Sequence, residues 1–329
     1  MNYRYMGNTG LPLSELSLGT WLSTGMKVDE KQFDSLTGTA YDAGINFFDN
    51  AEVYADGESE RVMGKVFAKK SWDRSSYILS SKVYFGAHGA ATRPSQKGLN
   101  RKHIIEGCEE ALQRLKTDYL DLYFCHRPDP HVAVAEIVWA MNILINQGKI
   151  LYWGTSEWSA QAITEAHYAA ARYNLIGPSM EQPQYNLFYR DKMELDYLPL
   201  FKQFGMGTTT WSPLASGMLT GKYNKGIPEG SRLTTAGFSW LKDVMHTEKR
   251  IGQVNQLMEI ATTIGCTPAA LAIAWCLKNP NASTVLLGAS TTGQLEDNLK
   301  AATVAPLLDA PLLSALDTIF ESKPESRIF

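Results

Sequence analysis

Short apolar segments alternate with amphipathic helical segments along almost the whole chain, and this alternation restricts the fold more than any other feature of the 329-residue sequence. Strands that alternate with helices at this spacing are joined by crossover connections and pair in parallel. The segment 101–116 is typical of the helices, with apolar residues at helical spacing after the N-cap candidate Asn100. The strand candidates are eight segments: 16–21, 45–50, 77–83, 119–126, 151–156, 180–186, 207–213 and 283–290.

Eight such units favour a closed (β/α)8 barrel, the TIM barrel, over an open doubly wound sheet. The open sheet needs a phosphate-binding glycine turn after its first strand. Here the first strand ends with the letters LGTW (residues 18–21), and no G-x-G-x-x-G follows. We therefore expect one barrel domain over residues 1–329, a length that single β/α barrels reach.

Two further segments fit this barrel. Residues 3–13 predict a β-hairpin that turns at residues 8–10 (NTG) and closes the bottom of the barrel. Residues 214–282, between the seventh and eighth strands, hold a long glycine- and proline-rich loop followed by helical patterns. A long loop in a compact domain is usually functional, so we expect a lid there, with extra helices after it.

Charge and cysteine usage exclude several classes of protein. The formal net charge of −3 argues against nucleic acid or an anionic membrane surface as the main partner. No run approaches the roughly 20 apolar residues that span a bilayer, and no apolar segment of a secretory signal follows Met1. Without a C-x-x-C motif, the cysteines predict buried thiols in a reducing cytoplasm, with no disulfide and no metal site. They are Cys108, Cys125, Cys266 and Cys276.

The predicted strands end in polar residues, at the face where β/α barrels build their active sites. The second strand ends at Asp49 and Asn50, the third near Lys82 and the fourth at His126. Because the interior of a barrel buries mostly aliphatic side chains, these groups need partners.

One arrangement satisfies these groups together. Asp49 pairs with Lys82, and the ammonium of Lys82 lies near the phenol of Tyr54 and lowers its pKa from about 10. Such a tyrosine can give a proton to a carbonyl oxygen, with His126 as a second hydrogen-bond donor. The cluster itself holds no source of hydride. A nicotinamide cofactor would supply the hydride. Separately, each residue has a structural explanation, as a plain ion pair or a core histidine; their combination favours catalysis.

At these residues the sequence resembles the aldo-keto reductase superfamily over essentially the whole chain. Within it, the chain is most similar to the branch that contains the β-subunits of voltage-gated potassium channels. The matching segments are GINFFDNAEVYADGESE (44–60), SSKVYFG (80–86), GLNRKHIIEG (98–107), DLYFCHRPDP (121–130), YWGTSEWSA (152–160), MEQPQYNLF (180–188), TTWSPLASGMLTGKYNKGIPEGSR (209–232), LAIAWCLKNP (271–280) and VLLGAS (285–290).

The resemblance implies a catalytic tetrad and an NADP(H) site. The tetrad falls on Asp49, Tyr54, Lys82 and His126. Trp211 would lie beside the nicotinamide ring, whose carboxamide would meet Ser156, Gln182 and, less strictly, Asn186. A GAS turn (288–290) before a helix suits a phosphate of the adenosine end. The remaining implied cofactor contacts are Thr20, Trp21, Asp49, Ser212, Pro213, Leu214, Ala215, Ser216, Lys222, Arg232, Gly288, Ser290, Gln294, Asp297 and Asn298.

The chain departs from the animal channel subunits at several positions. Those subunits carry asparagine at the position of His126, whereas typical reductases and the plant relatives carry histidine, as this chain does. Glu157 replaces an arginine, which removes a cationic contact near the cofactor, and Gly230 replaces a tyrosine of the closing loop. The chain also begins almost at the hairpin, so we expect no channel-plugging N-terminal extension.

These features leave two main functions. The first is an NADPH-dependent reductase of aldehydes and ketones, with Trp21, Tyr84 and Phe85 as aromatic walls of a pocket for a small carbonyl compound. The second is a cofactor-binding subunit of a potassium channel in which catalysis is secondary. A barrel with a dead site is a third, which the intact tetrad disfavours. The resemblance further implies a homotetramer in the cytoplasm, without direct membrane insertion.

Overall fold

Eight parallel strands close into a barrel in the structure, a computed structural model that describes residues 1–21, 29–229, 231–234, 244 and 246–325. Around the barrel the strands run in the order β10-β3-β4-β5-β6-β7-β8-β9. Each strand lies in a predicted segment, to within one residue, so the predicted (β/α)8 barrel is confirmed. The strands are β3 (Leu16–Gly19), β4 (Phe47–Asp49), β5 (Ile78–Val83), β6 (Leu120–Cys125), β7 (Ile150–Ser156), β8 (Met180–Gln182), β9 (Gly207–Thr210) and β10 (Thr284–Leu287).

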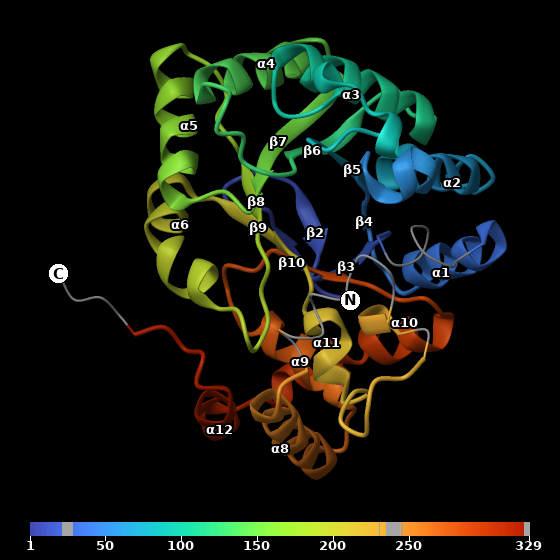
Figure 1. The fold of residues 1–329 in the computed structure, drawn as a ribbon, viewed down its shortest axis with the longest axis vertical. Helices are drawn as coiled ribbons and strands as arrows, with labels where there is room; N and C mark the ends of the chain where they lie inside the picture. Colours follow the sequence, from blue (N-terminus) through green and yellow to red (C-terminus); the bar gives the residue numbers. More distant parts are fainter. Residues whose placement is uncertain (22–28, 230, 235–243, 245, 326–329) are drawn as a thin grey trace.

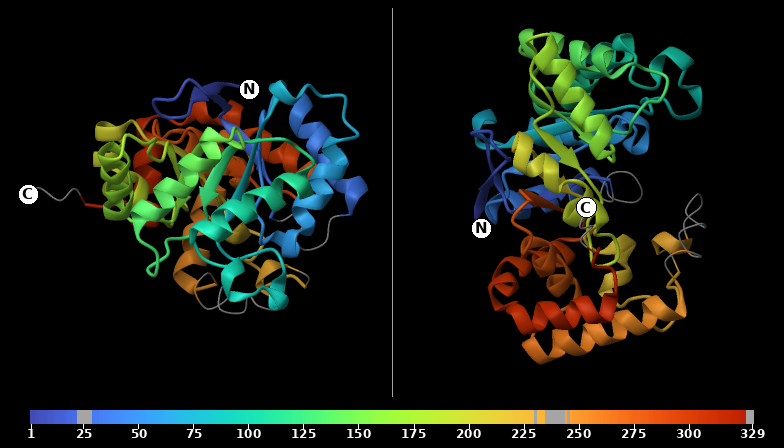
Figure 2. Two further views of the ribbon diagram at one scale, coloured as in Figure 1. Left: turned by 90° about the horizontal axis from the view of Figure 1, so that it is seen from above. Right: turned by 90° about the vertical axis from the view of Figure 1, so that its left-hand side faces the viewer.

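Helices surround the barrel, and extra helices gather beside β9 and β10, as Figures 1 and 2 show. The extra helices are α8 (Glu248–Ile264), α11 (Ala301–Val304) and α12 (Ala310–Phe320), of which α8 lies between β9 and β10 in sequence as predicted. The surrounding helices are α1 (Glu30–Asp42), α2 (Glu58–Phe67), α3 (Arg101–Leu115), α4 (Val134–Asn146), α5 (Ala160–Arg172), α6 (Leu198–Phe204), α9 (Pro268–Leu277) and α10 (Thr292–Leu299).

Side-chain caps fix where several of these helices begin. The Asn100 side chain accepts a hydrogen bond from the backbone N–H of His103 at the start of α3, as predicted. Asp29 and Thr291 cap α1 and α10 in the same way. Such a cap satisfies a backbone donor that the first turn leaves unpaired, and its loss costs about 1 kcal/mol.

A hairpin closes the bottom of the barrel, as predicted. Strands β1 (Tyr3–Tyr5) and β2 (Pro12–Ser14) pair in antiparallel fashion. The intervening turn packs against the start of β9, where the N–H of Asn8 donates to the carbonyl of Gly205 at 2.8 Å. Gly7 has a φ of +54°, and a Cβ there would lie 2.4 Å from the nitrogen of Gly207, so only glycine fits.

The inner face of the barrel changes from apolar at the bottom to polar at the top. The bottom layer includes Phe47, Ile78 and Met180, packed with Met6 and Leu13 of the hairpin segment. Side chains two residues apart on a strand share a face. The same inner face therefore continues upward from these three residues into Asp49 on β4, Ser80 and Lys82 on β5, and Gln182 on β8.

Three of the cysteines, Cys108, Cys125 and Cys276, are buried, whereas Cys266 is only half-buried, and all four are free thiols. No single helix in the described part of the chain is long and apolar enough to cross a membrane. Two pairs of consecutive helical segments, each pair bent at a short break, would be long and apolar enough by length and composition alone. The first pair is Glu248–Ile264 and Pro268–Leu277, and the second is Thr292–Leu307 and Ala310–Phe320.

Candidate active site

A buried ion pair lies near the upper end of the barrel interior. The Nζ of Lys82 is 2.5 Å from Oδ2 of Asp49 and 2.7 Å from the carbonyl oxygen of Asn50, and the side chains of Lys82 and Asp49 are 0% and 3% exposed. Burial acts most strongly and lowers the pKa of Lys82, but the charges and hydrogen bonds of Asp49 and Tyr54 together outweigh it and raise that pKa overall. Lys82 is therefore a fixed ammonium at neutral pH.

The carboxylate of Asp49 is held on its other side by two contacts that were not predicted from the sequence. Its Oδ1 accepts hydrogen bonds from Ser80 Oγ at 2.7 Å and from Gln182 Nε2 at 3.2 Å. Gln182 in turn donates to Thr209 Oγ1 at 3.1 Å. Ser80 could have been found from its place two residues before Lys82 on the same strand face. Gln182, expected to meet the cofactor, here orients Asp49.

Tyr54 stands beside this pair at the start of the 3-10 helix η1 (Tyr54–Gly57), five residues after the end of β4. Its phenol oxygen lies 3.3 Å from Lys82 Nζ. The next residues, Ala55 and Asp56, have φ of 50° and 53°, in the left-handed region. Such strain costs of order 1–3 kcal/mol per residue and concentrates at functional sites.

The net effect of its surroundings raises the pKa of Tyr54, so the expected lowering of that pKa is wrong. Burial is the largest cause of the rise, while the nearby ammonium of Lys82 acts in the opposite direction. The phenol is therefore protonated at neutral pH, which is the state a proton donor requires.

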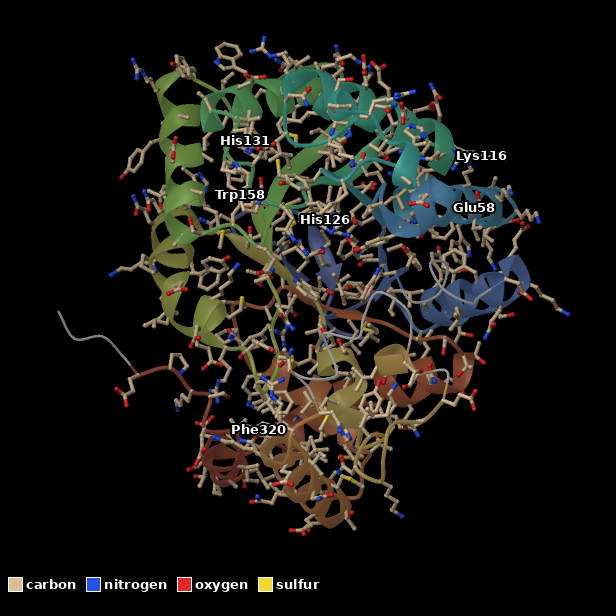
Figure 3. All side chains as sticks on the ribbon, viewed as in Figure 1. Glu58, Lys116, His126, His131, Trp158 and Phe320 are labelled. Atoms are coloured by element: carbon tan, nitrogen blue, oxygen red, sulfur yellow. The ribbon has the colours of Figure 1, made fainter. Side chains whose placement is uncertain are left out.

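His126 follows β6 and completes the predicted cluster; Figure 3 labels it inside the ring of helices. Its ring meets that of Tyr54 edge-on, with centroids 5.9 Å apart. Burial, with the charges of Lys82 and Arg127, holds the pKa of His126 well below its usual range, so the imidazole is neutral. Its buried Nδ1 has no hydrogen-bond partner among the described residues, which marks a group available to a ligand.

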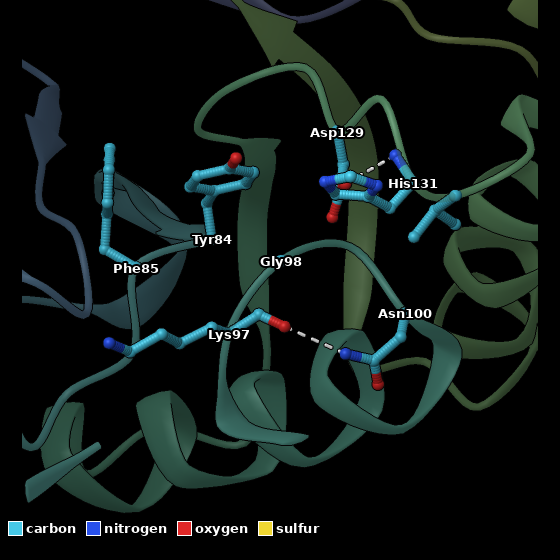
Figure 4. Close-up of a pocket in the computed structure, with 8 residues that line it drawn as sticks. Tyr84, Phe85, Lys97, Gly98, Asn100, Asp129 and His131 are labelled. Carbon is cyan, nitrogen blue, oxygen red and sulfur yellow. Dashed lines mark hydrogen bonds between the residues drawn. The ribbon is translucent and has the colours of Figure 1, made fainter. Parts of the chain in front are cut away.

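A pocket of about 480 Å³ lies beside this cluster, within the range of roughly 300–1,000 Å³ typical of small-molecule sites. Its wall includes two of the predicted pocket residues, Tyr84 and Phe85 (Figure 4). The Phe85 ring also contacts His126, with centroids 5.3 Å apart. The third predicted pocket residue, Trp21, is half-buried and is the last residue before the undescribed segment 22–28. It does not line this pocket. The lining residues are Tyr84, Phe85, Lys97, Gly98, Asn100, Asp129, His131 and Val132.

Glu157 holds Trp211 in place at the ends of β7 and β9. The indole Nε1 of Trp211 donates to Glu157 Oε1 at 2.9 Å, and the backbone N–H of Gln184 donates to the same oxygen at 2.6 Å. Lys192 pairs with the other carboxylate oxygen at 2.7 Å. From the sequence, Glu157 was expected only to remove a cationic contact near the cofactor; in the structure it also supports Trp211, an expected cofactor contact.

The turn that follows Trp211 contains most of the expected pyrophosphate contacts. Ser212, Ala215 and Ser216 have φ of 57°, 46° and 58°, so the segment 212–217, which includes Pro213 and Leu214, coils tightly. Asn186, a less certain carboxamide contact, instead donates to the carbonyl of Ser212 at 2.9 Å.

Two cations were expected to close over this turn. A Cβ added at Gly217 would lie 2.8 Å from Lys222 Nζ, so this ammonium sits directly against the turn. Arg232 begins η7 (Arg232–Thr234), but its side chain, like the whole of Gly230, lies outside the described residues.

The expected adenosine contacts lie around the start of α10, after Gly288. The N–H and Oγ of Ser290 both donate to Gln294 Oε1 at 2.9 Å. Asp297 accepts from Thr267 Oγ1 at 2.9 Å and pairs with Lys300, whereas Asn298 is buried.

The last two expected contacts, Thr20 and Ser156, are buried at the ends of β3 and β7. Thr20 Oγ1 donates to the carbonyl of Asp49 and Ser156 Oγ to that of Gln182, both at 2.9 Å. The expected residues thus lie at the carboxyl ends of the strands or in the connections that follow them.

One end of the closed β/α barrel thus holds a buried carboxylate–ammonium pair, a protonated tyrosine and a neutral histidine. Such a cluster can exchange protons with a ligand. Comparison with known families agrees: the model of the Aldo/keto reductase family matches residues 15–319. The chain belongs to the aldo/keto reductase family, and this membership supports an oxidoreductase.

Several similar proteins carry names of channel subunits. A probable voltage-gated potassium channel subunit beta of Arabidopsis thaliana is 47% identical over 326 residues, covering 99% of this chain and 98% of the relative. A protein of the same name from Oryza sativa subsp. japonica gives the same identity and coverage. A putative voltage-gated potassium channel subunit beta of Schizosaccharomyces pombe is 48% identical, covering 98% and 94%.

Proposed function

We propose that this protein is an NADPH-dependent reductase that converts aldehydes or ketones to alcohols. The observation that carries the proposal is the phenol of Tyr54, 3.3 Å from the Lys82 ammonium and beside the neutral ring of His126. Family membership supports the oxidoreductase class, and the small-molecule pocket next to His126 supports a small carbonyl substrate. An NADPH-oxidation assay with a panel of carbonyl compounds tests it.

In this mechanism a bound nicotinamide cofactor supplies the hydride. Tyr54 gives its phenol proton to the carbonyl oxygen, and the ammonium of Lys82 stabilises the phenolate that remains. Asp49 keeps that ammonium charged and in place. His126 directs a ring N–H at the same oxygen and thereby orients the substrate beside Phe85.

The residues after β9 fit the cofactor that the family implies. Position 217 of this turn admits only glycine, because its φ is +89° and a Cβ there would crowd the ammonium of Lys222. A cation held against a tight turn suits a pyrophosphate. We assign the pyrophosphate to Ser212–Ser216 with Lys222 and Arg232, and the ring to Trp211, Ser156 and Gln182. The adenosine end is assigned to Ser290, Gln294 and their neighbours.

We expect NADP(H) to bind more tightly than NAD(H), because we assign the 2′-phosphate to Ser290, Gln294 and the basic residue Arg232 of the long loop. Hydrogen bonds to a charged group contribute about 1.5–3 kcal/mol, so we expect a roughly ten- to hundredfold difference in Kd. Titration of cofactor-induced fluorescence quenching measures both constants. Ser290→Ala should weaken NADPH binding while sparing NADH, and equal affinities for both cofactors in the unaltered protein would remove the phosphate site.

The names of the similar plant and yeast proteins favour a second candidate, a cofactor-binding β-subunit of a voltage-gated potassium channel. For this chain, His126 favours the reductase, since the animal channel subunits carry asparagine there. Both functions use the same fold, so the contribution of His126 to turnover is the property that we test to separate them.

His126→Asn should slow carbonyl reduction and spare cofactor affinity. Loss of a donor at an oxyanion costs roughly 2.7–4 kcal/mol, and asparagine keeps a shorter donor, so we expect about a hundredfold or smaller fall in kcat/KM. Steady-state kinetics with the best aldehyde measure it. An unchanged kcat/KM would show that His126 only packs, and the two functions would regain equal standing.

We also propose that the protein forms a homotetramer, by analogy with the channel-subunit branch. Light scattering at micromolar concentration should give four times the mass of one chain. A monomer under those conditions would contradict the tetramer and weaken the channel-partner function with it.

A further inference from the structure

The connection between β5 and α3 forms one wall of the pocket beside His126. Tyr84, Phe85, Lys97 and Gly98 all line that pocket, although they lie at opposite ends of the connection (Figure 4). The two ends are joined where the N–H of Gly98 donates to the carbonyl of Tyr84 at 2.7 Å. Between them the described chain forms only short 3-10 turns, so the position of the wall depends on how its ends are held.

A buried carboxylate holds the first end of this wall. Glu52 is 2% exposed, and its Oε1 accepts the backbone N–H groups of Tyr84 at 2.7 Å and of Gly86 at 2.8 Å. These two amides flank Phe85, so Glu52 fixes the backbone that carries the Phe85 ring. Glu52 also lies two residues before Tyr54, and its own N–H donates to the carbonyl of Lys82 at 3.2 Å. One side chain thus links the catalytic segment to the wall.

A buried histidine holds the second end. His103 on α3 places Nε2 at 3.3 Å from Glu52 Oε2 and Nδ1 at 2.8 Å from the carbonyl oxygen of Gly98. Both partners are acceptors, and only the imidazolium has an N–H on each ring nitrogen to donate to both. Burial acts to lower the pKa of His103, but Glu52 reverses the effect and raises it, in agreement with that charged state.

We propose that Glu52 and His103 are positioning residues that fix the pocket wall and thereby set a preference for aromatic over small aliphatic aldehydes. This inference rests on the proposed reductase function. Phe85 packs edge-on against both Tyr84, at a centroid distance of 4.9 Å, and His126. Phe85 both contacts His126 and lines the pocket, so an aromatic aldehyde whose oxygen meets Tyr54 and His126 would place its ring against Phe85, whereas a short aliphatic aldehyde would not reach it. Neither Glu52 nor His103 touches the substrate.

The test is the ratio of kcat/KM for benzaldehyde to kcat/KM for propanal, because a ratio does not depend on how much of a variant is folded. In His103→Ala we expect the ratio to fall roughly ten- to hundredfold, since displacement of a positioning group by about 1 Å can cost a hundredfold. The loss should appear mainly as a raised KM for benzaldehyde, with propanal nearly unchanged. Lys102→Ala, a change at the adjacent exposed residue of α3, should leave the ratio intact.

Glu52→Gln is the second variant, and it keeps an acceptor for the two amides while removing the charge that faces His103. We expect a smaller fall of the ratio, which also keeps the test decisive if His103→Ala does not fold. A parallel loss with both aldehydes, at constant ratio, would overturn the inference and leave only a structural role for the pair. If the unaltered protein binds NADPH but turns over neither aldehyde, nor any other carbonyl compound, the proposed function fails and this inference fails with it.

Discussion

Replacing Tyr54 with phenylalanine should remove most turnover and leave NADPH binding nearly intact. Tyr54 is the one hydroxyl within 3.3 Å of the Lys82 ammonium in the described part of the chain, and the proposed mechanism assigns proton transfer to it. Loss of a general acid typically lowers kcat by about 10²–10⁴-fold. Cofactor affinity should not change, because the phenol acts on the carbonyl oxygen. Single-turnover and steady-state kinetics measure the effect, with fluorescence titration for the affinity.

Tyr168→Phe is the matched control for this experiment. It also removes one tyrosine hydroxyl, but from an exposed residue of α5 outside the site. We expect kcat to stay within a few-fold of the unaltered protein. Near-normal kcat in Tyr54→Phe would show that another group donates the proton, and equal losses in both variants would contradict the special role of Tyr54.

Lys82→Met should be similarly damaging to turnover, and it should also lower the free energy of unfolding. Removing the ammonium leaves the Asp49 carboxylate buried at the top of the barrel with only neutral donors, Ser80 and Gln182. Breaking a buried pair in this way costs on the order of 3–5 kcal/mol. Equilibrium denaturant unfolding measures the change in free energy, provided that the transition is two-state.

The double variant Asp49→Asn with Lys82→Met separates the stranded charge from other effects. An asparagine keeps an oxygen for Ser80 and leaves no buried charge, so we expect part of the lost stability to return while turnover stays low. An unfolding free energy of Lys82→Met equal to that of the unaltered protein would mean that water reaches Lys82 and that the buried pair is not formed.

The barrel follows from local features of the sequence, whereas the exact strand ends do not. Apolar periodicity located all eight strands, but the predicted segments run on to His126, Trp211 and Ser290, each of which follows its strand. The hydrogen bonding between parallel strands ends where the backbone turns away from the sheet. Residues just after that point can still match the sequence pattern of a strand, so the pattern alone does not locate the end. Two expected site residues, His126 and Trp211, therefore lie just beyond the strands that predicted them, whereas Asp49 and Lys82 lie within theirs.

The four central site residues could be anticipated because Asp49, Lys82 and His126 lie at or beside strand ends and Tyr54 lies in the loop after β4. The direction of the Tyr54 pKa shift could not, since it depends on how burial compares with the charge of Lys82. The link from Glu157 to Trp211 and that from Glu52 to His103 join segments far apart in sequence. No local pattern predicts such contacts, because only the closed barrel brings these strand ends and helices together.

The most direct test of the central claim is NADPH oxidation by the purified protein with a panel of aldehydes and ketones, followed at the nicotinamide absorbance. The account predicts a steady fall in absorbance with at least one aldehyde. The fall should require both protein and carbonyl compound, and it should disappear almost entirely in Tyr54→Phe. A protein that binds NADPH yet oxidises it with no member of the panel, or with equal rates in Tyr54→Phe, would contradict the assignment of Tyr54 as the proton donor of a carbonyl reductase.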